Sequence, residues 1–208
     1  MLQFRLFGFP VSVEPFFWLT MALVLGGMNV SDPESLRRLI VVVGAGFLSI
    51  LIHELGHALT MRRLGDQRVE IVLHGFGGMA RGSRYLSRWQ DLLVSAAGPA
   101  AQYTSGLLVG LWLLPTLGGQ LNPSGRLFLA SFARTSELWA LINLLPVLPL
   151  DGGHICRSMI GTKPSLRLSL ILAGMAAVYF LLSGALIGAM LMSMLAHQSW
   201  QALQTYRA

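Results

Sequence analysis

The five residues His53-Glu54-Leu55-Gly56-His57 constrain this chain most, because they lie inside an apolar run, from about Leu39 to Met61, that is long enough to cross a membrane. Two histidines four positions apart share one face of a helix, so both imidazoles can reach one metal ion. The glutamate between them can act on a water bound to that metal. Ionisable groups are costly in hydrocarbon and are functional by default. The pattern therefore predicts a metal site within a membrane helix rather than a chance His-x-x-x-His pair.

The composition is that of a membrane protein. Of the 208 residues, 54% are apolar and only 12% are charged, whereas soluble domains carry about 25% charged residues. We expect an all-α polytopic membrane protein with a small interfacial β element, forming a single membrane-embedded domain over residues 1–208. The apolar runs predict about six transmembrane helices, at residues 15–30, 39–61, 92–117, 127–148, 166–182 and 185–205.

The number of spans depends on the C-terminal part of the chain. Residues 166–195 are apolar throughout, which is too long for one ordinary span and slightly short for two with a loop. Ser183 and Gly184 offer a break, so we favour six spans over five. Near the N-terminus, no small-x-small cleavage site follows the first apolar run cleanly, and we interpret that run as a retained span rather than a signal peptide.

Two short segments have the character of β-strands. Residues 3–13 alternate loosely and turn at residues 8–10, which predicts a hairpin at the membrane interface. Residues 69–73 alternate apolar and polar side chains, as a strand does. The glycine-rich residues 74–78 follow directly, and we expect a flexible loop there.

The arginines indicate the orientation of the spans. The formal net charge is +6, and six arginines lie in the loop after the second span, against one in the loop after the third. The positive-inside rule makes the first of these loops cytoplasmic, so six spans place both termini and the proposed active site on the cytoplasmic side. Arg37 and Arg38 fall outside in this scheme, which counts against it. Because the arginines cluster in short loops, we expect contacts with lipid headgroups and no binding of nucleic acid.

A third ligand must join the two histidines, because a catalytic zinc takes three protein ligands and keeps one position for water. The sequence offers five candidates, which are Asp151, His74, Glu137, His154 and His197. Asp151 is favoured because it lies at the same predicted membrane depth as the histidines. Prolines before it and glycines after it also let the backbone bend, so that the short carboxylate can turn inward.

Two motifs in this chain resemble those of the site-2 proteases, a family of intramembrane zinc metalloproteases. They are His53-Glu54-Leu55-Gly56-His57 and the segment from Asn143 to Leu150-Asp151-Gly152. The resemblance covers most of the chain, since Phe76-Gly77-Gly78 and Gly98-Pro99 also occur in the family's order. It implies that His53, His57 and Asp151 bind one zinc ion, that Glu54 activates the water, and that Asn143 contacts the substrate backbone near the scissile bond. The chain is similar to a short form of the family without a soluble accessory domain.

The chain departs from the family's pattern at two positions. The family's Gly-Pro-x-x-Asn ends here in Gln102, which leaves the packing or hydrogen bonding of that position open. His154 stands where an arginine often follows Asp-Gly-Gly. We favour a structural role for His154 over a role beside the metal.

We therefore predict hydrolysis of a peptide bond in or near the transmembrane segment of a membrane-protein substrate, within the lipid bilayer. The strand at residues 69–73 and the glycines Gly77 and Gly78 would receive the unwound substrate by edge pairing. Two alternatives remain, namely a membrane metal transporter and a catalytically inactive scaffold that keeps its metal. A metallopeptidase of another class, with Glu137 as third ligand, is discounted because Glu137 lies on the wrong side of the membrane in the expected topology. The sequence indicates neither the identity of the substrate nor the oligomeric state.

Overall fold

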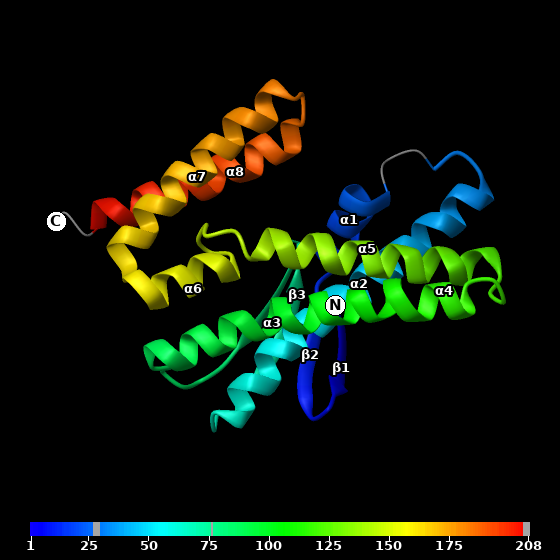
Figure 1. Cartoon of the computed structure of the whole chain (residues 1–208), viewed down its shortest axis with the longest axis horizontal. Coiled ribbons are helices and arrows are strands. Elements are labelled where there is room, and N and C mark those ends of the chain that lie inside the picture. The colour runs from blue at the N-terminus through cyan, green and yellow to red at the C-terminus, as the bar shows by residue number, and fades with distance from the viewer. Residues whose placement is uncertain (27–29, 76, 206–208) are drawn as a thin grey trace. The chain divides into compact units, whose positions relative to one another are not determined.

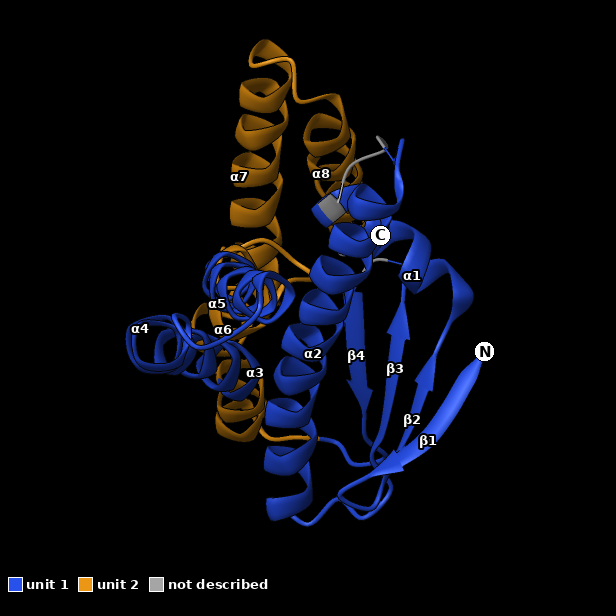
Figure 2. Ribbon diagram, turned by 90° about the vertical axis from the view of Figure 1, so that its right-hand side faces the viewer, with its two compact units in different colours: residues 1–85, 97–141 blue, residues 86–96, 142–208 orange. Residues whose placement is uncertain are grey.

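A computed structural model describes residues 1–26, 30–75 and 77–205 of the chain (Figure 1). The chain divides into two compact units, of which unit 1 comprises residues 1–85 and 97–141, and unit 2 comprises residues 86–96 and 142–208 (Figure 2). Residues 27–29, at the end of the first expected span, lie outside the described residues. Phe76, in the expected glycine loop, also lies outside them.

Unit 1 contains a four-stranded sheet in the order β1-β2-β3-β4. Strands β1 (Leu2–Leu6) and β2 (Phe9–Val13) form an antiparallel hairpin, and β2 pairs in parallel with β3 (Glu70–His74). Strand β4 (Gly77–Arg81) pairs antiparallel with β3 and forms one edge of the sheet. The expected hairpin and the expected strand are therefore confirmed, within one or two residues at their ends.

The expected loop at residues 74–78 is wrong in its second half, because Gly77 and Gly78 begin strand β4. Glycine has low intrinsic β-propensity and offers no side chain to pack, so the segment lacks the sequence pattern of a strand. The segment forms a strand because it pairs with β3. His74 lies opposite Gly77, and Leu73 lies opposite Gly78.

Helix α2 (Pro33–Arg63) carries the histidine motif and is longer than the expected span at both ends. It begins after Asp32, whose carboxylate accepts a hydrogen bond from the Ser35 amide, while the Ser35 hydroxyl accepts one from the Asp32 amide. This capping box, with Pro33 at the first helical position, explains why the helix starts six residues before the apolar run. Before it come α1 (Pro15–Met21) and the π-helical segment η1 (Ala22–Gly26).

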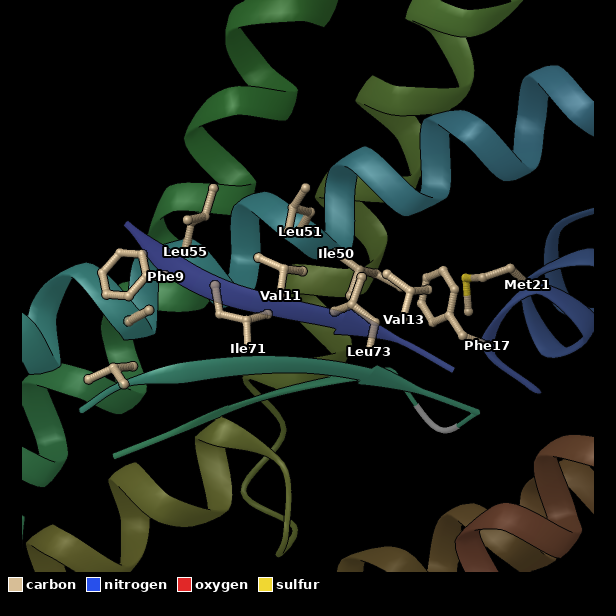
Figure 3. Close-up of a cluster of buried hydrophobic side chains, with 12 residues drawn as sticks. Phe9, Val11, Val13, Phe17, Met21, Ile50, Leu51, Leu55, Ile71 and Leu73 are labelled. Atoms are coloured by element: carbon tan, nitrogen blue, oxygen red, sulfur yellow. The ribbon is translucent and has the colours of Figure 1, made fainter. Parts of the chain in front are cut away.

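The main apolar core of unit 1 lies between the sheet and α2 (Figure 3). Alternate side chains of β2 and β3 face α2, as the two-residue period of a strand requires, and they meet apolar side chains from the last half of that helix. The labelled members of this core are Phe9, Val11, Val13, Phe17, Met21, Ile50, Leu51, Leu55, Ile71 and Leu73. The sheet therefore packs directly against the helix that carries the motif.

The rest of unit 1 consists of helices that approach closely through small residues. They are the second half of α3 (Arg88–Leu108), the π-helical η2 (Val109–Leu113), the short α4 (Leu114–Leu117) and α5 up to residue 141 (Pro123–Asn143). A Cβ at Gly56 of α2 would collide with the Ala97 carbonyl oxygen of α3. Small residues on both helices therefore let α2 and α3 come close together.

Unit 2 contains the first part of α3, the end of α5, and the helices α6 (Asp151–Ile160), α7 (Thr162–Leu182) and α8 (Leu186–Thr205). The start of α3 is tied to α6 by Asp91, which accepts hydrogen bonds from Arg157 (3.1 Å) and Ser158 (2.7 Å). Helices α7 and α8 pack along each other, and the chain reverses between them at Ser183 and Gly184, where a break was expected.

Two helices among the described residues are long and apolar enough to cross a membrane, Pro33–Arg63 and Thr162–Leu182, by length and composition. A shorter apolar helix occupies Pro15–Leu25. Helices occur at all six expected spans, but the count of six crossings is not confirmed. Helix α6 was not expected at all, because Gly152 and Gly153 lower the helix propensity of its first turn.

Candidate metal centre

The two histidines of α2 point their outer ring nitrogens toward a common position. His53 and His57 are both buried, and their Nε2 atoms are 3.0 Å apart. Their rings stand almost perpendicular to each other, with centroids 4.7 Å apart. The four-residue spacing thus places two nitrogen donors on one buried face of the helix, as the sequence predicts.

A buried polar network contacts His53 at its Nδ1 atom. The Nδ1 atom of His53 lies 2.9 Å from the Oε1 atom of Gln102 on α3. The side-chain amide of Gln102 in turn donates to the Ser49 hydroxyl (2.9 Å), which is also 2.9 Å from the hydroxyl of Ser136 on α5. Since the Gln102 oxygen can only accept, it fixes the proton of His53 on Nδ1 and leaves Nε2 as a lone-pair donor.

This network gives Gln102 the role that the sequence left open, and it adds two residues that the sequence analysis missed. Ser49 lies one helical turn before His53 on the same face of α2, so helical spacing alone carried a signal for it. Ser136 carried no such signal, because it is 87 residues from Ser49 in the chain. Both serines are fully buried.

Glu54 lies against the edge strand of the sheet. Its side chain is buried, and a Cβ added to Gly78 of β4 would collide with the Glu54 carboxyl group. The main chain of the strand therefore comes closer to this carboxylate than any residue with a side chain would permit. The sequence suggested that Gly78 belongs to a flexible loop, whereas in the structure it lies in strand β4, in contact with the Glu54 side chain.

His57 is bordered by a second glycine. A Cβ added to Gly98 of α3 would collide with the His57 ring at its Nε2, Cε1 and Cδ2 atoms. Pro99 follows inside the helix and is fully buried. The Gly98-Pro99 pair, which the sequence singled out only by its place in the family's order, therefore makes room for one of the two imidazoles.

Asp151 belongs to unit 2, where it is half-buried and forms the first residue of α6. The chain before it leaves α5 at Asn143 and turns back over the start of α6. A Cβ at Gly152 would collide with the Leu144 carbonyl, and a Cβ at Gly153 would collide with the main chain at Val147 and Leu148. The Ser169 hydroxyl of α7 accepts a hydrogen bond from the Leu148 amide (2.9 Å). The glycines therefore serve close packing of this turn, and Asn143 lies at its beginning, half-buried.

The other candidate ligands are distributed over four elements, β3, α5, α8 and α6. His74 lies on β3 next to Leu73, which faces α2, so the His74 side chain belongs to the opposite face of the sheet. Glu137 packs against Gly106 of α3 and Gly110 of η2, which lie one and two helical turns beyond Gln102. His197 stacks on Trp200 of its own helix. His154 lies on α6, one turn after Asp151.

One carboxylate outside the apolar helices fixes the loops next to β3 and β4. Asp66 accepts hydrogen bonds from the amides of Arg68 (3.0 Å), Ser83 (2.6 Å) and Arg84 (2.9 Å), and from the Ser83 hydroxyl (2.9 Å). Burial raises the pKa of Asp66, but these hydrogen bonds outweigh it and hold the pKa below the ordinary value of 3.8. The carboxylate thus joins the end of α2 to the segment that follows the edge strand.

The donor set fits zinc. Two nitrogen ligands of one tetrahedral zinc ion, each bound at about 2.0–2.1 Å, lie about 3.3 Å apart, close to the 3.0 Å between the two Nε2 atoms. Histidines whose second nitrogen is held by an oxygen acceptor are also typical of metal sites, and His53 meets that condition through Gln102.

Comparison with known proteins places this geometry in a family. No family model matches the chain. A candidate zinc metalloprotease of Synechocystis sp. is 32% identical over 168 residues, which cover 74% of this chain and 42% of that protein. A zinc metalloprotease of Methanocaldococcus jannaschii is 24% identical over 160 residues, covering 77% of this chain and 45% of that protein. Among solved structures, the site-2 protease from Methanocaldococcus jannaschii matches with a TM-score of 0.68 at 23% identity, over 97% of this chain and 94% of that chain. The chain belongs to the site-2 protease family.

The chain spans less than half the length of the two curated relatives described above. Its match to the solved site-2 protease, by contrast, covers nearly all of both chains, so the fold shared with that protein includes the sheet as well as the helices.

Proposed function

We propose that this member of the site-2 protease family is an intramembrane zinc endopeptidase that hydrolyses a peptide bond in or near the transmembrane segment of a membrane-protein substrate. The observation that carries the proposal is the buried pair of Nε2 atoms on His53 and His57, 3.0 Å apart. The pair lies on a helix apolar enough to cross a membrane, with a buried glutamate between the two histidines. Such groups are costly to place in hydrocarbon unless they serve a function.

The proposed metal site contains one zinc ion per chain, held by His53, His57 and Asp151. Two histidines and one carboxylate form a donor set of known catalytic zinc sites. Support for Asp151 comes from the family's motif and from its place at the start of α6, where closely packed glycines fix the turn that precedes it. When bound, zinc supplies a Lewis acid for the scissile carbonyl and lowers the pKa of a water ligand.

Glu54 is the proposed general base. Its carboxylate accepts a proton from the attacking water, whose oxygen bonds to the scissile carbonyl carbon. As the carbon–nitrogen bond breaks, Glu54 returns the proton to the leaving nitrogen. Its buried position beside the β4 main chain limits its contact with bulk water. Limited solvent access keeps the proton between the carboxylate and the reacting groups.

We propose that the substrate binds as an added strand at the edge of the sheet formed by β4. A transmembrane helix hides its carbonyl groups in hydrogen bonds and must unwind before hydrolysis. An edge strand offers unpaired main-chain groups to such an extended segment, and Gly78 brings this edge directly against Glu54. Gly77 and Asn143 are further proposed substrate contacts, the latter by its match to the family's motif.

The proposed setting is a multi-pass membrane protein with six spans, with both termini and the active site on the cytoplasmic side. Helical segments of the fold occur at all six apolar runs of the sequence, and six arginines lie between the end of α2 and the start of α3, ends included. The substrate reaches the site from within the bilayer.

The test compares wild-type protein with Glu54→Gln and Asp151→Ala, all reconstituted in proteoliposomes. A synthetic transmembrane peptide with a central glycine pair serves as substrate, cleavage is followed by mass spectrometry, and bound zinc is counted by elemental analysis. We expect about one zinc per wild-type chain, retained in Glu54→Gln without cleavage, and clearly reduced in Asp151→Ala. Cleavage by Glu54→Gln would refute the proposed base, and unchanged zinc in Asp151→Ala would refute the proposed third ligand.

Edge pairing has its own test, because backbone N-methylation removes a hydrogen-bond donor without changing the side chain. Peptides N-methylated at successive positions near the cleaved bond should lose cleavage at alternate positions only, since successive amides of a strand point in opposite directions. Equal loss at every position would argue against a bound strand. Zinc transport without cleavage in the same liposomes would favour the transporter alternative, and zinc binding with neither would favour the scaffold.

A further inference from the structure

A cavity of about 480 Å³ lies in unit 1, apart from the histidines, and arginines dominate its lining. It is formed by the β1–β2 hairpin, the end of α2, the segment that leads into β3, and the end of β4. Four of its lining residues are arginines and one is acidic, namely Arg5, Arg62, Arg68, Arg81 and Glu70. A volume of this size is typical of small-ligand sites.

The strand register explains why these charges meet. Arg5 lies opposite Pro10, and Glu70 lies opposite Arg81. The parallel pairing of Val11 with Ile71 puts the preceding residues, Pro10 and Glu70, next to each other. Because Val11 and Ile71 face α2 in the core, the residues of this row face the other way. The row therefore carries two arginines and one glutamate across the outer face of the sheet.

Two more arginines reach the cavity from outside the sheet. Arg62, near the end of α2, donates a hydrogen bond to the Phe7 carbonyl (2.8 Å), and its guanidinium lies 4.3 Å from the centroid of the Phe9 ring. These two contacts fix its position without neutralising its charge. Arg68 lies in the segment between Asp66 and strand β3, and its amide donates a hydrogen bond to the Asp66 carboxylate.

The cavity has an excess of positive charge. Its lining residues include four arginines and one glutamate, which give 4 − 1 = 3 more positive than negative charges. No ion pair joins these four arginines to a carboxylate within the part of the chain that the structure describes. Because four arginines line one cavity, they raise its electrostatic potential, and an anion bound there is stabilised.

We propose that this arginine cavity is a binding site for a phosphate group, either on an anionic lipid headgroup or on a soluble phosphate. Arginine presents its donors as a planar fork that matches phosphate oxygens. A phosphate has enough oxygens to accept from several such forks at once, whereas a carboxylate has two oxygens. The site is independent of the proposed peptidase chemistry, because none of its lining residues belongs to the histidine motif.

The test measures binding by the purified full chain in a neutral detergent at constant ionic strength. One arm titrates dihexanoyl phosphatidylglycerol and the other titrates inorganic phosphate, each followed by the shift of Tm. The variants are Arg5→Gln/Arg81→Gln in the cavity and Arg38→Gln/Arg126→Gln elsewhere, which remove the same charge. Arg5 and Arg81 are exposed and their replacement is not expected to change folding. A third variant, Glu70→Gln, removes the one carboxylate of the cavity.

We expect a saturable rise of Tm, an apparent Kd at least about tenfold weaker in Arg5→Gln/Arg81→Gln, and a Kd about threefold tighter in Glu70→Gln. A response to the lipid alone would identify a headgroup site, a response to phosphate alone a soluble ligand, and a response to both a site for the phosphate group itself. The proposal is overturned if neither probe saturates, or if the matched control pair weakens binding as much as the cavity pair.

Discussion

Two glycines are in contact with side chains that the proposed chemistry requires. Gly78 lies against the carboxyl group of Glu54 and Gly98 lies against the ring of His57. We expect Gly78→Ala to displace the carboxylate and abolish most peptide cleavage while zinc stays bound. Gly98→Ala should instead displace a metal ligand and reduce zinc content. Cleavage assays beside elemental analysis separate the two effects.

The matched control for this pair is Gly174→Ala on α7, where an added Cβ has no atom within 4 Å. Alanine is favoured over glycine inside a helix by about 0.5–1 kcal/mol, so this variant should be as stable as wild type or slightly more. If Gly78→Ala cleaved at the wild-type rate, the close approach of β4 to Glu54 would not matter for catalysis.

Gln102 offers a second prediction at this scale. Gln102→Leu removes the acceptor for His53 Nδ1 and the donor for Ser49, both of which are buried. Loss of such a supporting contact lowers metal affinity about 10–100-fold. We expect a zinc affinity reduced in that range by chelator competition, with little change in Gln201→Leu on the exposed side of α8. Gln102→Asn, which restores the family's residue, should recover part of the affinity.

Part of the candidate metal site could be predicted from the sequence. The close approach of His53 and His57 was predictable because helical spacing alone brings their rings together. The role of Gln102 was not, because the contact with His53 depends on how closely α2 and α3 pack, and that packing is fixed by the absence of side chains at Gly56 and Gly98.

At the scale of elements, Asp66 links the end of α2 to the segment after β4. Its pKa is lowered in the folded chain because hydrogen bonds outweigh burial. A lowered pKa means that the ionised carboxylate stabilises the fold above about pH 3.8 and that this contribution disappears as pH falls through the folded pKa. We therefore expect Asp66→Asn to lower Tm by several degrees at pH 7, with the difference from wild type shrinking below pH 4.

The control for the Asp66 experiment is Glu14→Gln, which removes one carboxylate elsewhere in unit 1. Tm is followed between pH 7 and pH 3 for all three proteins. A constant difference between wild type and Asp66→Asn across this range would contradict the proposed contribution of the ionised form. A reduced zinc content in Asp66→Asn would show in addition that the loops near β4 influence the metal site.

Elements with a regular pattern were predictable, and those formed by partners were not. The β1–β2 hairpin and β3 were predictable from the alternation of their side chains. Strand β4 and helix α6 each carry a glycine pair in their first residues. Glycine lowers the strand or helix propensity of these segments, but it lets them approach other parts of the chain closely. Helix α5 ends at Asn143, three residues before Pro146, since a proline excludes the helical conformation just before it.

At the scale of the whole molecule, the number of spans is the main open prediction. Cys156 is the only cysteine, so Cys156→Ala gives a cysteine-free background. In that background, single cysteines at positions 85, 120 and 208 are tested with a membrane-impermeant maleimide in intact and inverted vesicles. Six spans predict labelling of positions 85 and 208 from the cytoplasmic side and of position 120 from the opposite side.

The two alternatives give different patterns. If only Pro33–Arg63 and Thr162–Leu182 cross the membrane, positions 85 and 120 would be labelled from the same side. Five spans, with residues 166–195 as one long span, would move position 208 to the outside. The sequence could not decide this, because a helix that is half-covered by its neighbours needs less apolar surface than an isolated span.

The glycines beside Glu54 and His57 also bear on resistance to inhibitors. A compound that rested on Gly78 or Gly98 would touch main chain only, and a larger residue at either position would collide with the carboxylate or the imidazole behind it. Escape from such a compound by point substitution would therefore disable the proposed peptidase activity, and resistant variants would have to arise farther from the proposed metal ligands.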